Sequence, residues 1–167
     1  MRYLLVLAGL FSGIICFGQI QYMTVGINGL TCSQCSRSVE LQLRKLSFIK
    51  DVDMNLQQTE GRLFIVKSNT AIPFEEIAQA VKDAGFSIRF LSITFTPETR
   101  SLIKDKELQS GANRFYIINI SGNSGSSNTF QFAGKLFMSP ATYKKYREWL
   151  PPPQPGLPSY WLIPSEK

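Results

Sequence analysis

Two cysteines separated by two residues carry the clearest chemistry in this sequence. They belong to the segment 29–35, GLTCSQC, in which Cys32 is predicted to lie in the loop after a strand and Cys35 in the first turn of a helix. The N-terminus of a helix has a partial positive charge and free N–H groups, which stabilise thiolates and lower the pKa of a cysteine. Two thiolates in such a place can hold a soft ion of low coordination number such as Cu(I). We therefore predict that Cys32 and Cys35 form a metal site.

The remaining composition restricts what this site can be. The 167 residues include no histidine, which excludes histidine-based acid–base catalysis, Ser-His-Asp and Cys-His triads, and zinc sites with histidine ligands. Zn²⁺ usually takes four protein ligands, and this chain offers two good ones. The sequence thus favours Cu(I), with Hg(II), Zn(II) and Cd(II) as further candidates. Met23, Met54 and Met138 could add thioether ligands, although packing is the simpler interpretation of all three.

Two other interpretations of the cysteine pair remain open. In a thiol–disulfide redox protein, Cys32 would be the nucleophile and Cys35 the resolving thiol. Thioredoxin-like motifs often have an aromatic residue before the first cysteine, where this sequence has Thr31. The pair could also be an inert structural disulfide. All three interpretations place the chemistry at the same two side chains.

The N-terminal 18 residues have the pattern of an export signal. Arg2 precedes an apolar run, 4–17, that is too short for a comfortable membrane span and is typical of a signal-peptide core. Cys16 and Gly18 supply small residues before a cut that would leave Gln19 first. We predict that residues 1–18 are a cleaved signal peptide and that the mature chain is periplasmic or secreted, without a membrane span. An uncleaved N-terminal anchor is the alternative.

Residues 19–95 alternate between strand and helix patterns. Apolar and polar residues alternate in four runs, which predicts strands over 20–27, 48–57, 62–67 and 86–95, and a shift in the last run suggests a bulge. Apolar residues at helical spacing predict helices over 33–46 and 73–84. The order β-α-β-β-α-β predicts an α+β fold of the ferredoxin-like kind, with two helices on a four-stranded antiparallel sheet. Because the pattern is complete, we expect residues 19–95 to form a domain that folds alone.

Residues 96–167 do not continue the alternation of strand and helix patterns seen in residues 19–95. We expect a linker or short helix over 96–113 and a small β-rich region over 114–167. Within that region, runs at 115–120 and 130–138 predict a β-hairpin around the polar loop 121–128. A short helix over 141–150 should follow Ser139 and Pro140, and the proline-rich segment 151–155 should be polyproline II.

The first half of the chain resembles the heavy-metal-associated domain. The features that carry this resemblance are the segment 29–35, the following helix with Val39 and Leu43, and the run AGF at 84–86. The family includes small copper chaperones, N-terminal modules of copper-exporting P-type ATPases and periplasmic mercury-binding proteins. Its usual motif is Gly-Met-Thr-Cys-x-x-Cys, and Leu30 replaces the methionine, which conserves volume. The resemblance covers roughly residues 21–95.

The predicted function is that of an exported protein that binds a soft metal ion and traffics or sequesters it without catalysing a reaction. A partner's cysteine can attack a two-coordinate ion as a third ligand, so we expect a protein partner that exchanges metal with Cys32 and Cys35. Thiol–disulfide redox activity is the alternative function. A formal net charge of +6 is too weak to indicate nucleic-acid binding without a basic stripe. The basic cluster 144–147 could dock an anionic partner, although a solvated helix face is the simpler interpretation.

Overall fold

A computed structural model describes most of the chain. The described residues are 20–66, 70–101, 103, 106–118, 128–152, 156 and 158–165. The predicted signal peptide at 1–18 lies outside them, as do residues 121–127 of the predicted polar loop and 153–155 of the proline-rich segment. Within the described residues, no helix is both long and apolar enough to cross a membrane.

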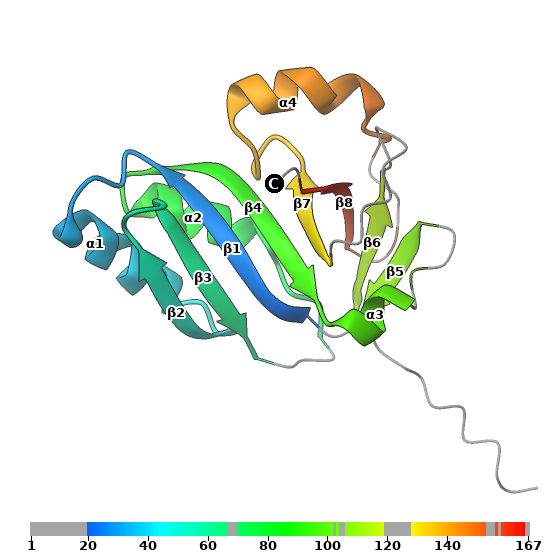
Figure 1. Ribbon diagram of the computed structural model, residues 1–167, viewed down its shortest axis with the longest axis horizontal. Coiled ribbons are helices and arrows are strands. Elements are labelled where there is room, and N and C mark those ends of the chain that lie inside the picture. Colours follow the sequence, from blue (N-terminus) through cyan, green and yellow to red (C-terminus); the bar gives the residue numbers. More distant parts are fainter. Residues whose placement is uncertain are drawn as a thin grey trace, which may run out of the picture.

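The first half, residues 20–95, contains six elements in the predicted order (Figure 1). They are β1 (Ile20–Asn28), α1 (Ser33–Leu43), β2 (Ile49–Asn55), β3 (Glu60–Ile65), α2 (Glu75–Asp83) and β4 (Ser87–Phe95). The strands pair in the order β2-β3-β1-β4, and all of these pairs are antiparallel. The α+β, ferredoxin-like arrangement predicted for this part of the chain is confirmed.

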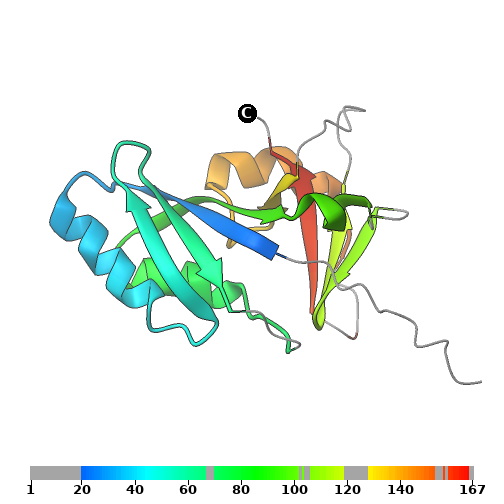
Figure 2. The same cartoon turned by 60° about the horizontal axis from the view of Figure 1, so that its bottom comes forward.

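The helices α1 and α2 cover one face of these four strands (Figure 2). In α1, Val39 and Leu43 are fully buried one turn apart, and in α2 the same is true of Ile77 and Val81. Both pairs have the spacing of residues on one helix face, so burial against the sheet selects this orientation. Gly85, with φ of +90°, ends the second helical segment, because a residue without a Cβ adopts this backbone conformation at low cost.

The bulge predicted in the last strand of this half is present. Between β1 and β4, Ile27 pairs with Ile88 while Gly26 pairs with Phe90, so Arg89 is an extra residue on β4. The ring of Phe90 lies against Gly26 so closely that a Cβ at that glycine would be 2.4 Å from the ring. Because of this extra residue, Ile88 and Leu91 both face the core although they are three residues apart in the sequence.

The second half, residues 96–165, adds four strands to the same sheet, together with the helices α3 (Pro97–Ser101) and α4 (Pro140–Tyr146) and the 3-10 turn Arg147–Trp149. The strands are β5 (Glu107–Ser110), β6 (Asn113–Ile117), β7 (Thr129–Ala133) and β8 (Ser159–Pro164). The described residues form one sheet of eight strands in the order β2-β3-β1-β4-β7-β8-β6-β5. The stretch expected to be a linker or short helix therefore contains both the helix α3 and the strand β5.

The predicted hairpin between the runs at 115–120 and 130–138 is wrong. Strand β8 lies between β6 and β7, parallel to β6 and antiparallel to β7. The hairpin of this half is instead β5–β6, which turns at Gly111 with φ of +59°. The physical reason is that β8 brings Tyr160 and Leu162 into the core, a gain that a local hairpin of β6 and β7 would forgo.

The two halves share one hydrophobic core. Strand β7 pairs with β4 along 92–94 and 129–131, and Phe137 and Ser139 continue this pairing through backbone hydrogen bonds to Leu91 and Arg89, each 3.0 Å long. Aromatic side chains from both halves pack together beside this junction; they are Phe74, Phe95, Phe115, Phe130, Phe132 and Tyr160. The second half therefore covers the edge of β4, which would otherwise be open.

Candidate metal centre

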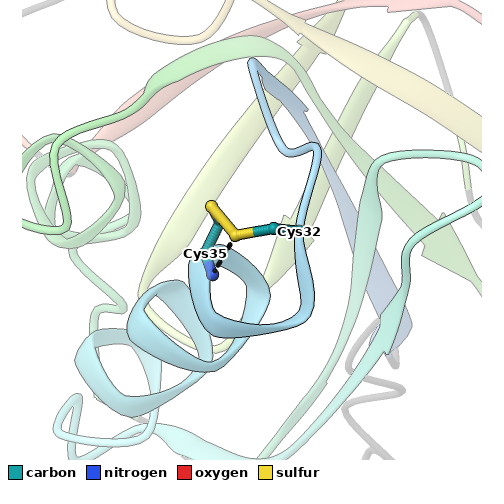
Figure 3. Close-up of a disulfide and its surroundings, with 2 residues drawn as sticks. All are labelled: Cys32 and Cys35. Carbon is teal, nitrogen blue, oxygen red and sulfur yellow. Dashed lines mark hydrogen bonds between the residues drawn. A yellow bond between two sulfur atoms is a disulfide. The ribbon is translucent and has the colours of Figure 1, made fainter.

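The cysteine pair lies where the loop after β1 enters α1: Cys32 is the last residue of the loop and Cys35 lies in the first turn of the helix (Figure 3). Gly29 begins the loop with φ of +80°, and the side chain of Leu30 is buried beneath it with 1% exposed. Thr31 and Cys32 in the loop are exposed, as are Ser33 and Gln34 at the start of α1, and Cys35 is half-buried. The buried leucine thus anchors the loop while the first cysteine remains open to solvent.

Cys32 and Cys35 point toward one another and are joined as a disulfide (Figure 3). Their Cα atoms are 5.2 Å apart. The fold therefore brings the two predicted ligands to one point. Two electrons and two protons convert this disulfide into two thiols, so metal binding through both sulfurs requires the reduced pair.

Cys32 is also the N-cap residue of α1. Its backbone is extended, with φ of −138° and ψ of 158°, and its Sγ accepts a hydrogen bond from the Cys35 N–H at 3.1 Å. Its carbonyl accepts the first helical hydrogen bond, from the Ser36 N–H at 3.0 Å. A sulfur in this position faces the positive end of the helix, which stabilises the anionic form once the disulfide is reduced. The first turn of α1 contains no acidic residue to oppose this effect.

The residues around the start of β4 contact the cysteine loop. The Asn28 side-chain amide donates to the Ser87 hydroxyl at 3.3 Å, which ties the end of β1 to the start of β4. A Cβ added to Gly29 would lie 4.0 Å from the ring of Phe86, so this aromatic residue stands at the root of the cysteine loop. Phe86 belongs to the run AGF at 84–86 that carries the family resemblance, whereas the hydrogen bond between Asn28 and Ser87 has no signal in the local sequence.

The methionines are accounted for by packing. Met23 is completely buried in the main core, and Met138, with 3% exposed, packs in a second cluster with Ala133, Tyr146 and Ile163. Met54 is half-buried on β2 and its sulfur approaches the position where Gly61 would carry a Cβ. Among the described residues, no group of three or more cysteine, aspartate or glutamate side chains could hold a metal ion. Within the described residues, the sulfurs that the structure brings together are those of Cys32 and Cys35.

The arrangement suits a soft ion better than Zn²⁺. Two thiolates can satisfy Cu(I) or Hg(II), whereas Zn²⁺ in a protein usually completes a set of four ligands. An exposed first cysteine leaves room for a thiolate of another protein to approach the ion. Chemically, the loop can bind a thiophilic ion and release it by ligand exchange, or it can exchange its disulfide with another thiol.

Known proteins are similar in sequence to the first half of this chain. Residues 24–87 match the heavy-metal-associated domain family. The copper-transporting ATPase RAN1 of Arabidopsis thaliana is 31% identical over 80 residues, which are 48% of this chain and 8% of the ATPase. The copper-transporting ATPase 1 of Rhizobium meliloti is 31% identical over 87 residues, which are 50% of this chain and 10% of that protein. The chain thus spans a tenth or less of these two relatives.

A small protein and two solved structures match over a similar part of the chain. The copper chaperone CopZ of Staphylococcus epidermidis is 23% identical over 65 residues, which are 39% of this chain and 93% of the chaperone. The crystal structure of a copper-binding domain from HMA7, a P-type ATPase, is 28% identical, with a TM-score of 0.37 over 41% of this chain and 90% of that one. Oxidized MerP from Ralstonia metallidurans CH34 is 23% identical, with a TM-score of 0.37 over 42% of this chain and 94% of that one. The match to the heavy-metal-associated domain family thus covers residues 24–87, and the rest of the chain lies outside it.

Proposed function

We propose that this protein binds Cu(I), or another thiophilic ion, through the thiolates of Cys32 and Cys35 and passes it to or takes it from a protein partner. The observation that carries the proposal is the convergence of two sulfurs at the start of α1, where Cys32 is exposed and Cys35 is half-buried. The relatives named copper-transporting ATPase and copper chaperone support Cu(I) as the first candidate. Hg(II) and Cd(II) fit the same sulfur pair, and Zn(II) fits it less well.

Transfer by ligand exchange follows from the exposure of the site. The ion is held by two ligands only, and a partner's cysteine can add as a third before one of the original bonds breaks. Metal then passes between proteins without release into water. This role requires binding and exchange and no bond-making on a substrate, so we propose a binding protein rather than an enzyme.

The compartment in which the protein works is proposed from the signal-peptide pattern of residues 1–18. The apolar run at 4–17 favours export, and an exported chain would work in the periplasm or outside the cell. Intact-mass analysis of the secreted or periplasmic protein should show a chain that begins at Gln19. A mass that includes Met1, or a lipid on Cys16, would contradict this part of the proposal.

Thiol–disulfide exchange is the second candidate function, and the disulfide between Cys32 and Cys35 favours it. The two functions differ in what the reduced protein does. As a metal-binding protein, the reduced chain should take up one Cu(I) per molecule, and it should reduce insulin no faster than a small dithiol does. Catalytic insulin reduction without retained metal would favour the redox function instead.

A further inference from the structure

The helix α4 presents two different sides. Its N-cap is Ser139, whose hydroxyl accepts a hydrogen bond from the Thr142 N–H at 3.2 Å, and the helix continues into the 3-10 turn Arg147–Trp149. Its inner side packs on β7 and β8, where Tyr146 is 7% exposed beside Ala133 and Ile163. This packing fixes which residues face outward.

The outer side is cationic and contains an exposed tryptophan. Lys144, Lys145 and Arg147 are exposed, and Trp149 is 55% exposed. Glu148 is the single acidic residue of the segment 140–152. We call the set Lys144, Lys145, Arg147 and Trp149 the α4 surface. Three cations against one carboxylate leave this surface positively charged.

The exposure of Trp149 is unusual within this protein. Among the large apolar side chains that the described residues leave exposed, it is the only aromatic one. The other tryptophan, Trp161, is half-buried and stacks on Tyr116 with 4.6 Å between ring centroids. An indole combines an apolar body with one polar N–H, a combination that is favoured at the boundary between bilayer and water.

We propose that the α4 surface docks on anionic phospholipid bilayers. Each cation near an anionic leaflet strengthens binding by about a factor of five, and the tryptophan can enter the headgroup region. Because the apolar side of α4 is already packed on β7 and β8, this docking rests on the three cations and on Trp149, and not on an apolar helix face that enters the bilayer. Both views place α4 over the second half of the sheet, away from the loop that precedes α1 (Figures 1 and 2), so docking leaves the cysteine pair accessible.

The test uses vesicles and residues 19–167, a chain that contains every described residue and lacks the apolar run 4–17. Vesicles of phosphatidylcholine alone are compared with vesicles that contain about one-third phosphatidylglycerol, and binding is measured by co-sedimentation. Trp149 fluorescence should shift to shorter wavelength with the anionic vesicles only, and added salt should reverse binding because the attraction is electrostatic. Trp149→Phe should remove the shift while Trp161 remains as the internal reference.

A pair of charge-reversal variants separates the α4 surface from the overall charge. Lys144→Glu with Lys145→Glu should weaken binding to anionic vesicles at least about tenfold, or 1.4 kcal/mol. Lys45→Glu with Lys50→Glu changes the total charge equally at exposed positions on the first half, and it should leave binding within about twofold of the unaltered protein. Circular dichroism verifies that both variants are folded.

Three outcomes of the binding measurements would each overturn the proposal. They are the absence of binding to anionic vesicles, equal binding to both kinds of vesicle, and equal weakening by the two charge-reversal pairs. Binding without a change in Trp149 fluorescence would also overturn it, because the tryptophan would then lie outside the contact. None of these measurements depends on metal, so the result is independent of the function proposed for Cys32 and Cys35.

Discussion

Removal of the second half is expected to destabilise the metal-binding half. Phe74 and Phe95 are both completely buried, although they belong to the first half. The ring of Phe74 lies 5.0 Å from that of Phe132 and 5.9 Å from that of Phe115, and the ring of Phe95 lies 5.6 Å from Phe115. A chain that ends at Thr96 loses all of these partners and exposes both phenylalanines to water.

The size of the effect follows from this burial. Full burial of a phenylalanine side chain stabilises a protein by about 1.5–3 kcal/mol, so two of them account for about 3–6 kcal/mol. Domains of this kind are stable by about 5–15 kcal/mol in total. The truncated chain should therefore retain little or no stability, in contrast to the expectation from the sequence pattern that residues 19–95 fold alone.

Urea unfolding followed by circular dichroism tests this prediction on chains 19–167 and 19–96. The shorter chain should show either no cooperative transition or a free energy of unfolding that is lower by at least about 3 kcal/mol. Phe74→Ser serves as a control, because it should be costly in the long chain and nearly neutral in a short chain where Phe74 is already exposed. Equal free energies of unfolding for the two chains would refute the reasoning.

Three further predictions concern single residues. Asn113→Ala should lower the free energy of unfolding by about 2–4 kcal/mol, because its buried amide bonds both the N–H and the carbonyl of Ile72; a urea titration with a loss below about 0.5 kcal/mol would contradict this. Gly26→Ala should cost about 1–3 kcal/mol through its clash with Phe90, and the cost should vanish in a Phe90→Ala background, as a double-mutant cycle can show. Burial and a neighbouring carboxylate raise the pKa of Tyr160 above its ordinary value of 10.0, so its contribution to stability is complete below that pH and is lost as the pH rises further. Stability measured between pH 9 and about 11 should thus fall less steeply in Tyr160→Phe.

The first half of the fold was predictable because its signals are local. The apolar spacing of α1 and α2 and the alternation of β1 and β4 each lie within a dozen residues, and turn residues such as Gly85 separate them. The cysteine pair was predictable for the same reason, since its two members are three residues apart at the start of one helix. Boundaries were less accurate: α1 ends at Leu43 and not at residue 46.

The second half could not be predicted in the same way, because its pairings connect distant residues. The parallel pairing of β6 with β8 places Arg114 opposite Ser159, and the antiparallel pairing of β4 with β7 places Thr94 opposite Thr129. Local patterns identify the apolar runs but do not state which run is the neighbour of which, and a hairpin is only the simplest choice. The shared aromatic core decides the arrangement, and it forms only when both halves are present.

The central claim is that the two reduced cysteines supply all of the protein's ligands to Cu(I). X-ray absorption at the copper edge tests this claim most directly. The chain 19–167 is reduced with a phosphine instead of a thiol, loaded anaerobically with one equivalent of Cu(I) and freed of unbound metal. We expect one Cu(I) per chain with two sulfur ligands, and no retained copper in the variant Cys32→Ser with Cys35→Ser. A third sulfur ligand from the same chain, or stoichiometric copper in the double variant, would contradict the account.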